Sequence, residues 1–333
     1  MSSVPVRDLE NVFNRIKSIW PQKSHFLITG GTGFFGRWVI EAIAYIEQHK
    51  PSGNHYIILS RQNPSNLKKK YSVLENSFFE IIQHDLAEPI AFDHSVDYLL
   101  HAATDVTNLG QKHEFDFNIN IQATKNICDA VKNKKLKKFL FVSSGGVYEN
   151  GESASEDSAL KTNLSANSYG VSKIKSENLV KELSDVCIAR CFSFVGPYAA
   201  PQMAVMQMLQ QKKDEKPIEV KAPQVVRSYM YIADLVVSLF HLLLLQNQHL
   251  IYNIGSPQKI TLKNLAEMIA ELDTHQVAVL IGQDREATGL AGDIYFPNAT
   301  RYDREYEAGV TTSLKDSLKF TLQFLKQSKT GET

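Results

Sequence analysis

The chain has 333 residues, of which 43% are hydrophobic and 22% charged, and its 36 Lys and Arg residues balance 36 Asp and Glu residues. This is the composition of an ordinary globular protein, without the basic excess of a nucleic-acid-binding protein or the acidic bias of a disordered chain. The length suffices for one large α/β domain with a smaller appendage, or for two domains.

Cysteine, histidine and hydropathy patterns indicate a cytoplasmic protein without a metal site or membrane segment. Cys128, Cys187 and Cys191 are odd in number and lack CxxC spacing, which favours reduced thiols over disulfides. No two histidines are three or four residues apart, so no helical metal site is visible. The first 20 residues mix charges throughout, unlike a signal peptide. The most apolar stretch, 235–245, is about half a membrane span and contains His241, which indicates a core helix.

The N-terminal segment has the spacing of an amphipathic helix that precedes the first strand. Its apolar residues recur every three to four positions, at Val6, Leu9, Phe13, Ile16 and Trp20. We expect residues 1–23 to form a helical extension that packs on its own domain, although a partner-binding helix is the alternative. Pro21 ends the helix.

Short apolar strands alternate with helical patterns through the next part of the chain. Strands are expected within 25–31, 55–61, 78–86, 96–103, 137–144 and 186–194, and helices include 34–50, 113–133 and 168–184. This alternation predicts an α/β fold with a Rossmann-like doubly wound parallel sheet. The regularity ends near residue 190, after which prolines alternate with helices near 202–212, 231–246, 261–272 and 313–327. We therefore predict a dinucleotide-binding domain over 24–190, to which segments near 229–255 return, and a smaller C-terminal substrate-binding lobe over 191–228 and 256–327.

A glycine-rich loop follows the first strand and opens a helix. Gly30, Gly33 and Gly36 fit the G-x-x-G-x-x-G form of the dinucleotide fingerprint, in which bare backbone admits a pyrophosphate and the helix N-terminus faces the phosphates. A phosphate-binding P-loop needs Lys and Ser or Thr after its last glycine, and this chain has Arg37 and Trp38. The loop therefore predicts a dinucleotide site.

The end of the second strand favours NADP(H) over NAD. NAD enzymes usually place Asp or Glu there to bind the adenosine ribose, whereas this chain has Ser60 and Arg61. Arg61 can pair with a 2′-phosphate, with help from Arg37, although a surface arginine without a ligand is the alternative. Asp85, after the third strand, is a candidate for the adenine amino group or a simple turn residue.

The candidate catalytic group comprises Tyr169, Lys173 and a strand-end serine. The i, i+4 spacing places Tyr169 and Lys173 on one face of a helix, and an ammonium near a phenol lowers a tyrosine pKa from about 10. The pair alone is weak evidence. Ser143 and Ser144 end a predicted strand, at the sheet edge where ligands bind. The order of glycine loop, serine and Tyr/Lys helix makes coincidence implausible.

These motifs together resemble extended short-chain dehydrogenases/reductases of the NAD-dependent epimerase/dehydratase family, which act on nucleotide sugars. The resemblance covers residues 24–327. "TGGTGFFG" is similar to the family's TGxxGFxG, "LLHAAT" to its (H)xAA segment, "FVSSGGVYE" to SSxxVYG, "YGVSK" to YxxxK, "ARCFSFVGP" to LRxxNVYGP and "VRSYMYIADL" to RDFxHVxDL.

The resemblance implies roles for individual residues. It assigns catalysis to Ser144, Tyr169 and Lys173. It assigns cofactor binding to Gly30, Gly33, Phe34, Phe35, Gly36, Ser60, Arg61, Asp85, Leu86, Ala102, Ala103, Tyr169 and Lys173. It assigns substrate binding to Thr104, Ser144, Ser193 and Arg227. It also places Asn120 near the active-site helix, although the alternative is that the Asn120 amide only packs between helices. It also implies a nucleotide-sugar partner and a homodimer through the helices at 113–133 and 168–184.

Departures from the family pattern reduce the number of reactions that this chain is expected to catalyse. Sugar 4,6-dehydratases carry Thr-Asp-Glu where this chain has Ser144, Gly145 and Gly146, and glycine cannot transfer protons. Decarboxylating relatives keep a glutamate at the position of Gly146. The late family arginine is replaced by Leu290, so Arg285, Arg301 or another group is expected to bind a diphosphate.

The sequence thus leaves three functional hypotheses. The first is an NADP(H)-dependent reductase of a 4-keto nucleotide sugar, with Tyr169 as general acid. The second is a 4-epimerase with tightly bound NAD, and the third is a non-catalytic dinucleotide-binding sensor.

Overall fold

The computed structural model describes residues 4–105, 117–163, 168–282, 293–307 and 309–327. The chain divides into two compact units. Unit 1 comprises Met1–Tyr148, Leu160–Arg190 and Val236–Tyr252, and unit 2 comprises Glu149–Ala159, Cys191–Leu235 and Asn253–Thr333.

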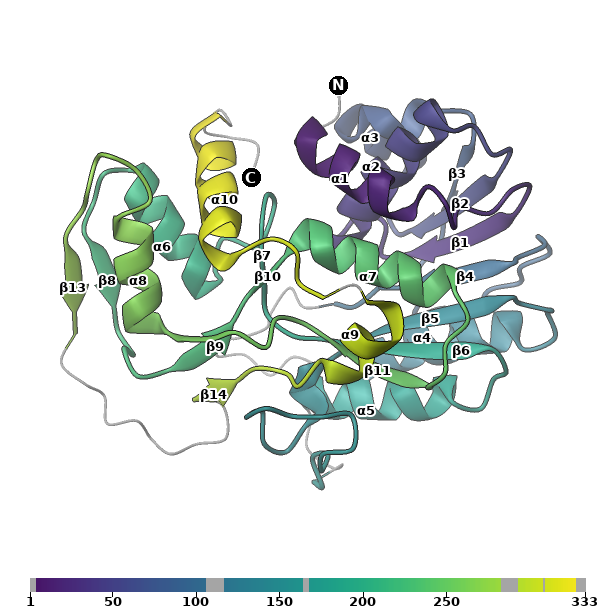
Figure 1. Ribbon diagram of the computed structural model, residues 1–333. Helices are drawn as coiled ribbons and strands as arrows, with labels where there is room; N and C mark the ends of the chain where they lie inside the picture. The colour runs from purple at the N-terminus through teal and green to yellow at the C-terminus, as the bar shows by residue number, and fades with distance from the viewer. Residues whose placement is uncertain (1–3, 106–116, 164–167, 283–292, 308, 328–333) are drawn as a thin grey trace. The chain divides into compact units, whose positions relative to one another are not determined.

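A seven-stranded sheet in the order β11-β6-β5-β4-β1-β2-β3 forms the centre of unit 1 (Figure 1). Its strands are β1 (His25–Thr29), β2 (His55–Ser60), β3 (Phe79–Gln83), β4 (Tyr98–His101), β5 (Lys138–Ser144), β6 (Val186–Cys191) and β11 (Ile251–Ile254). Pairing is parallel, and Leu27 of β1 faces Ile57 of β2 on one side and Leu99 of β4 on the other. The strand order reverses between β1 and β4, where doubly wound sheets open a ligand crevice. The predicted fold class is confirmed.

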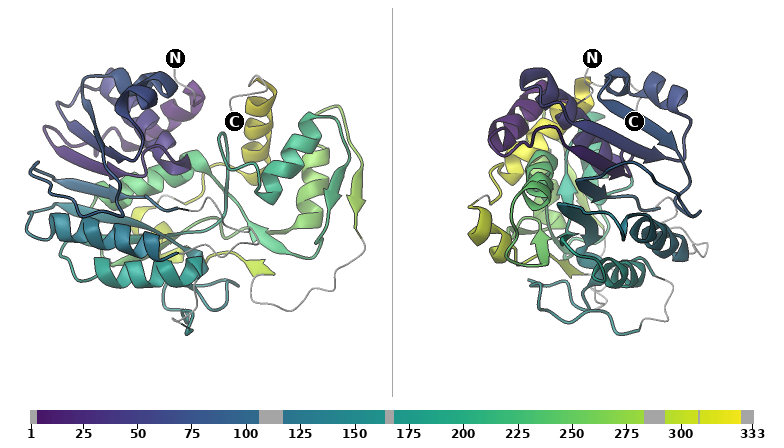
Figure 2. Two further views of the ribbon diagram at one scale, coloured as in Figure 1. Left: turned by 180° about the vertical axis from the view of Figure 1, so that it is seen from behind. Right: turned by 90° about the vertical axis from the view of Figure 1, so that its right-hand side faces the viewer.

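Helices cover both faces of this sheet because its strands are apolar on both sides. Figures 1 and 2 show α2 (Phe34–His49), α3 (Pro64–Lys70) and α7 (Ile232–Leu244) on one face, and α4 (Asn118–Val131) and α5 (Tyr169–Val180) on the other. The face under α4 and α5 is packed by a cluster that includes Ile127, Phe139 and Val180. The apolar stretch at 235–245 falls in α7, which is 13 residues long. Within the described ranges, no helix is both long and apolar enough to cross a bilayer.

The amphipathic N-terminal segment forms α1 (Val6–Ile16), which contacts α2. Leu9, Val12 and Ile16 are buried, and the backbone N–H of Val4 donates to Glu41 Oε2 of α2 at 3.2 Å. The helix therefore packs within unit 1.

In the residues that the structure describes, unit 2 combines short strands with helices. Its strands are β7 (Phe194–Val195), β8 (Ile218–Val220), β9 (Val226–Ser228), β10 (Met230–Tyr231), β12 (Lys259–Thr261), β13 (Val279–Ile281) and β14 (Ile294–Tyr295). Its helices are α6 (Ala204–Lys213), α8 (Leu262–Ala270), α9 (Thr300–Tyr306) and α10 (Leu314–Gln327). β9 lies between β12 and β14, which places Arg227 in the middle strand of a small sheet.

Candidate active site

The glycine loop joins β1 to α2, and its geometry requires glycine at two positions. Gly30 has a φ of +74°, and a Cβ there would lie 2.6 Å from the backbone of Ala102 and Ala103, which follow β4. A Cβ at Gly36 would lie 2.0 Å from the Gly30 carbonyl oxygen. Gly33 precedes α2 as its N-cap and donates its N–H to the Gly30 oxygen at 2.9 Å. The loop therefore presents bare backbone and a helix N-terminus, which suits a pyrophosphate.

A cavity of about 240 Å³ opens at the carboxyl ends of β1, β2 and β4. Among the residues expected to bind cofactor or substrate, Gly30, Gly33, Ser60, Arg61, Asp85, Leu86, Ala102, Ala103 and Thr104 line it. Phe34, Phe35 and Gly36 lie in α2 rather than in the lining. The lining further includes Thr32, Leu59, Gln62, His84, Ala87, Asp105, Ile119, Asn120 and Ala123. The residues that line the cavity fit a dinucleotide. The backbone of the glycine loop forms one wall of the cavity, and Arg61 lies at the end of β2.

Arg61 faces a carboxylate that follows β4. Its Nη1 lies 3.6 Å from Asp105 Oδ2, and its side chain is 61% exposed. The amide of Asn120, in α4, clamps Asp105 by accepting from its N–H at 2.7 Å and donating to its carbonyl at 3.2 Å. Sequence reasoning did not find Asp105, because no local pattern predicts that the β4 loop approaches the end of β2.

Arg37 is not among the residues that line the cavity. Its Nε is 3.6 Å from Glu41 Oε1, and its guanidinium lies 5.2 Å from the centre of the Tyr71 ring. Arg61 rather than Arg37 is thus the arginine placed at the cavity.

Three further cavity residues have local structural contacts. Asp85 Oδ1 accepts from the N–H of Ala87 at 3.0 Å, and the Leu86 carbonyl accepts from the Asn126 amide at 2.8 Å. Ser60 Oγ accepts from the N–H of Gln62 at 3.2 Å. These contacts shape the loops after β2 and β3.

Tyr169 and Lys173 share one face of α5, which begins at Tyr169 because Ser168 caps it. Lys173 is 3% exposed, and its Nζ donates to Thr104 Oγ1 at 2.7 Å and to the Val142 carbonyl at 2.9 Å. The ammonium lies 5.9 Å from the centre of the Tyr169 ring. The hydroxyl of Thr104, expected to contact substrate, is thus bound to Lys173.

The two strand-end serines differ in their surroundings. Ser143 is buried, and its hydroxyl donates to Glu177 Oε1 at 2.6 Å. Ser144 is half-buried, and its Oγ accepts from the N–H of Gly146 at 3.1 Å. A Cβ at Gly146 would lie 3.3 Å from Ser144 Oγ and 3.8 Å from Tyr169 Cδ1. Ser144, Tyr169 and the bare backbone of Gly146 therefore meet at one point.

A buried histidine, His101, connects β1, β4 and α4 near Lys173. The ring of His101, at the end of β4, contacts Thr29 Oγ1 through Nδ1 at 2.6 Å and Thr124 Oγ1 through Nε2 at 3.2 Å. Burial, together with the charge of Lys173, lowers the pKa of His101 to about 3. The ring is therefore neutral at physiological pH and links β1, β4 and α4.

Residues 26–255 match the model of the NAD dependent epimerase/dehydratase family, which is most of the chain. The chain belongs to this family. The family resemblance predicted from the motifs is confirmed, and with it the expectation that the protein is an enzyme.

Curated relatives of this epimerase/dehydratase-family enzyme include two that span most of its length. A dTDP-4-dehydro-6-deoxyglucose reductase of Escherichia coli is 30% identical over 82% of this chain and 89% of the relative. An uncharacterized UDP-glucose epimerase of Bacillus subtilis (strain 168) is 26% identical over 92% of this chain and 99% of the relative. Relatives with different reactions are thus similarly distant.

Solved structures of the family share the fold. The UDP-glucuronic acid 4-epimerase of Bacillus cereus, in complex with UDP-glucuronic acid and NAD, superposes with a TM-score of 0.72. It is 23% identical and covers 91% of this chain and 99% of its own. The NAD-dependent NDP-hexosamine 5,6-dehydratase TunA has a TM-score of 0.73 and 19% identity, covering 93% of this chain and 100% of its own.

The remaining expected substrate residues of this family member lie in unit 2. Arg227 Nη1 donates to the carbonyls of Val226 at 2.8 Å and Asp293 at 3.2 Å, and burial lowers the pKa of its guanidinium. The carbonyl of Ser193 accepts from the N–H of Met230 at 3.1 Å. Arg285 and Leu290 lie outside the described residues.

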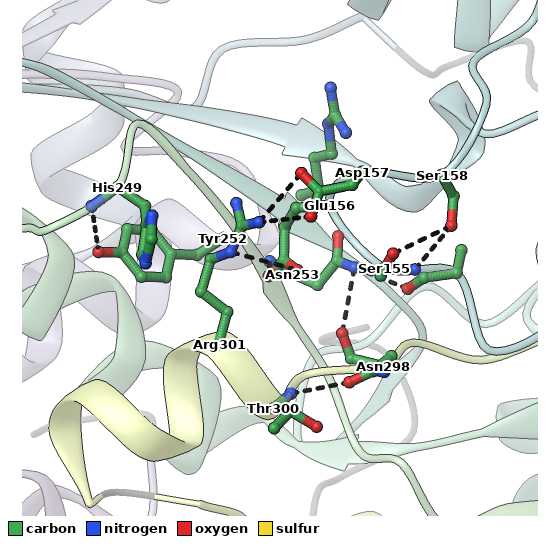
Figure 3. Close-up of polar contacts among 12 residues, drawn as sticks. Ser155, Glu156, Asp157, Ser158, His249, Tyr252, Asn253, Asn298, Thr300 and Arg301 are labelled. Carbon is green, nitrogen blue, oxygen red and sulfur yellow. Dashed lines mark hydrogen bonds and ion pairs between the residues drawn. The ribbon is translucent and has the colours of Figure 1, made fainter.

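Arg301 is engaged within unit 2. Figure 3 shows its guanidinium beside two acidic residues, with Nη2 2.9 Å from Asp157 Oδ2 and Nε 3.6 Å from Glu156 Oε2. Glu156 in turn accepts from the N–H of Asn253 at 2.8 Å. Arg301 therefore holds the loop at 149–159 to the segment at 298–301. Among the described residues, no cluster of three or more His, Cys, Asp or Glu side chains is arranged to hold a metal ion.

Proposed function

We propose that this enzyme is an NADP(H)-dependent reductase that acts on the 4-keto group of a nucleotide-linked sugar. One observation carries the proposal: Ser144 and Tyr169 face Gly146, which brings no proton-transferring side chain to the reacting centre. The similarity to a dTDP-4-dehydro-6-deoxyglucose reductase over most of both chains supports it.

Dehydration is disfavoured at this centre. Removing water from a sugar needs an acid and a base beside the substrate. Gly145 and Gly146 occupy the positions of that pair in the family's 4,6-dehydratases, and a side chain at 146 would begin between Ser144 Oγ and the Tyr169 ring. Ser144, Tyr169 and Lys173 remain, and these suffice for carbonyl reduction.

In the proposed reaction, bound NADPH supplies the hydride that adds to the keto carbon. Tyr169 donates its phenolic proton to the carbonyl oxygen as negative charge develops there. Ser144 donates a hydrogen bond to the same oxygen and orients it. Lys173, held in α5, lowers the pKa of Tyr169 electrostatically, and the phenolate regains its proton from solvent after turnover. The product is the 4-hydroxy sugar.

The preference for NADP(H) rests on Arg61, which lines the cavity where an adenosine 2′-phosphate would be placed. No carboxylate of β2 competes for this position, since the strand ends at Ser60. We infer that this enzyme binds NADPH more tightly than NADH.

The reductase proposal is tested by incubating the purified protein with NADPH and dTDP-4-keto-6-deoxyglucose. NADPH oxidation should match product formation one to one, and Tyr169→Phe should reduce kcat at least about 100-fold while leaving NADPH affinity within about threefold, since general acid catalysis typically contributes this much. Full activity in the Tyr169→Phe variant would remove Tyr169 from the mechanism. Absence of NADPH oxidation across dTDP-, UDP-, GDP- and CDP-linked 4-keto sugars would overturn the proposal.

A 4-epimerase is the second candidate, favoured by the carboxylate of Asp105 near Arg61. A carboxylate at this position suits a ribose hydroxyl and so NAD. In an epimerase the bound cofactor is reduced and then reoxidised within one turnover, so it stays bound. Extraction of the purified protein separates the two: tightly held NAD supports the epimerase, whereas exchangeable NADP supports the reductase.

We also infer a cytoplasmic homodimer that packs α4 and α5 against their copies, as the family resemblance implies. α4 and α5 contact one another in unit 1, and the three cysteines are buried, which suits a reducing compartment. Light scattering with size-exclusion chromatography tests the dimer, and Asp129→Lys at the exposed side of α4 should weaken it. A monomer at micromolar concentration would contradict it.

A further inference from the structure

The ammonium of Lys173 is buried, so its position depends on the acceptors around it. An ammonium has three N–H donors and no acceptor, and burial without partners is costly. Its acceptors include the Val142 carbonyl of β5 at 2.9 Å and Thr104 Oγ1, after β4, at 2.7 Å. Of these two contacts the one to Thr104 is the shorter, and it is made by a side chain, which a substitution can remove.

The Thr104 hydroxyl is oriented to accept. Its own proton is donated to the Ala103 carbonyl at 2.8 Å, which directs an oxygen lone pair toward Lys173. The next residue is held as well, because the Asn120 amide clamps the N–H and carbonyl of Asp105. The acceptor is thus fixed on the β4 loop before any ligand binds, and it ties α5 to β4.

Three side chains near Lys173 come from three different elements, and two of them, Tyr169 and His101, are titratable. Tyr169 of α5 lies with its ring centre 5.9 Å from the ammonium, and the Phe141 ring of β5 lies at 4.9 Å. His101 of β4 lies close enough to respond to the charge of Lys173 and stays neutral. Among these described neighbours, Tyr169 is the group whose ionisation the ammonium favours.

We propose that Thr104 is a positioning residue that holds the Lys173 ammonium toward Tyr169 and thereby sets the pH at which Tyr169 acts as an acid. This inference rests on the proposed function. Without the hydroxyl, Lys173 keeps the Val142 carbonyl and moves toward β5. The phenol then has a weaker positive field and loses its proton at higher pH.

The matched variants are Thr104→Val, which keeps the shape and removes the hydroxyl, and Thr104→Ser, which retains it. Thr321→Val is the control for removing a buried hydroxyl, because Thr321 in α10 is buried and donates to the Ser317 carbonyl at 2.7 Å. The probes are NADPH and dTDP-4-keto-6-deoxyglucose. We measure kcat against pH, the NADPH dissociation constant by nicotinamide fluorescence, and the ionisation of Tyr169 by ultraviolet difference absorbance against the matching Tyr169→Phe variants.

In Thr104→Val, kcat at neutral pH should fall about tenfold, the scale set by loss of one hydrogen bond to a charged group. The alkaline limb of the kcat profile and the phenolate absorbance of Tyr169 should both move up by about half a pH unit or more, as a weaker positive field requires. Thr104→Ser should keep both where the unmodified enzyme has them. Thr321→Val should leave both in place.

The proposal is overturned if the Tyr169 ionisation in Thr104→Val stays where it is, or if Thr104→Ser shifts it equally. The absorbance titration needs no turnover, so an inactive Thr104→Val variant is still decided by it, and Thr104→Ala replaces Thr104→Val if that variant does not fold. Retained activity in Tyr169→Phe and Lys173→Met would instead contradict the proposed function. Failure of the positioning role and failure of the reductase are therefore separate results.

Discussion

The carboxylate of Glu177 holds the guanidinium of Arg190 in a bidentate pair, at 2.9 and 2.7 Å, with side chains 0% and 1% exposed. Arg190 also donates to the Tyr148 hydroxyl at 2.9 Å, and Ser143 donates to the same carboxylate. Burial alone would lower the pKa of Arg190, but its hydrogen bonds to Glu177 raise it above its usual range. This network joins the helix that carries Tyr169 and Lys173 to β5 and β6.

Removing one member of the Glu177–Arg190 pair should strongly destabilise the protein, because the other charge stays buried without its partner. We expect Glu177→Met to lower the free energy of unfolding by about 3–5 kcal/mol. Glu177→Met combined with Arg190→Met should recover part of that loss. Lys181→Met is the control, because Lys181 lies 3.7 Å from Glu177 but is partly exposed, and its pair should contribute under about 1 kcal/mol. Urea unfolding measures all three, and equal losses in Glu177→Met and Lys181→Met would contradict the assignment.

Gly30 and Gly53 offer a matched test of the glycine loop. Both have positive φ, +74° and +71°, but a Cβ at Gly30 meets backbone at 2.6 Å whereas one at Gly53 has only the Lys23 side chain at 3.7 Å. Gly53→Ala should cost about 1–2 kcal/mol of stability and leave NADPH binding intact. Gly30→Ala should in addition weaken NADPH binding more than about tenfold, since the loop must move off β4. Equal NADPH affinity in both variants, measured by fluorescence titration, would remove the loop from the cofactor site.

Arg61 and Asp105 should control the choice of cofactor. Arg61→Gln removes the cation available to a 2′-phosphate and should weaken NADPH binding about tenfold, with little effect on NADH. Asp105→Asn removes the carboxylate that lies 3.6 Å from Arg61 and should tighten NADPH binding relative to NADH. Arg37→Gln serves as the control, because the Arg37 side chain pairs with Glu41 instead of lining the cavity. Calorimetric titration gives both dissociation constants, and an unchanged ratio in Arg61→Gln would show that the enzyme does not read the 2′-phosphate there.

His101 should make the enzyme sensitive to mild acid. Its pKa of about 3 in the folded state lies below the ordinary value of 6.5, so the unfolded state binds more protons between these values. Its contribution is complete above pH 6.5 and is lost as the pH falls toward 3. Between pH 6.5 and 4.5 the loss in the free energy of unfolding is at most about 3 kcal/mol, since each pH unit in this range contributes about 1.4 kcal/mol.

Replacing this histidine should flatten the acid dependence. His101→Asn should be less stable at pH 7 but lose less stability than the unmodified enzyme between pH 6.5 and 4.5. His94→Asn is the control, because His94 is exposed and pairs with Glu80 at the surface. Urea unfolding at both pH values measures the difference, and an identical decline in all three proteins would rule out burial of a neutral ring.

The fold class followed from local patterns in the sequence. Alternating apolar strands and helices predict the doubly wound sheet because a parallel strand is apolar on both faces and needs a helical crossover. Most of the expected strands and helices lie close to the described ones. The helix expected over 168–184 starts at Tyr169, where Ser168 caps it, but ends at Val180, four residues before the expected end. Such ends depend on single capping contacts, which periodicity does not encode.

By itself the sequence determined the family, the parallel sheet and the chemistry available to the enzyme, because glycine spacing, i, i+4 pairing and the absence of carboxylates at 145 and 146 are local properties. The tertiary structure decided which groups meet: that Asp105 faces Arg61, that Thr104 holds Lys173, and that Ser143 is taken up by Glu177 while Ser144 faces Gly146. The contacts of Arg61 with Asp105, Thr104 with Lys173 and Ser143 with Glu177 join residues about 30 to 70 positions apart, and no local pattern encodes them. They arise because parallel strands from distant parts of the chain bring their carboxyl ends to one edge of the sheet.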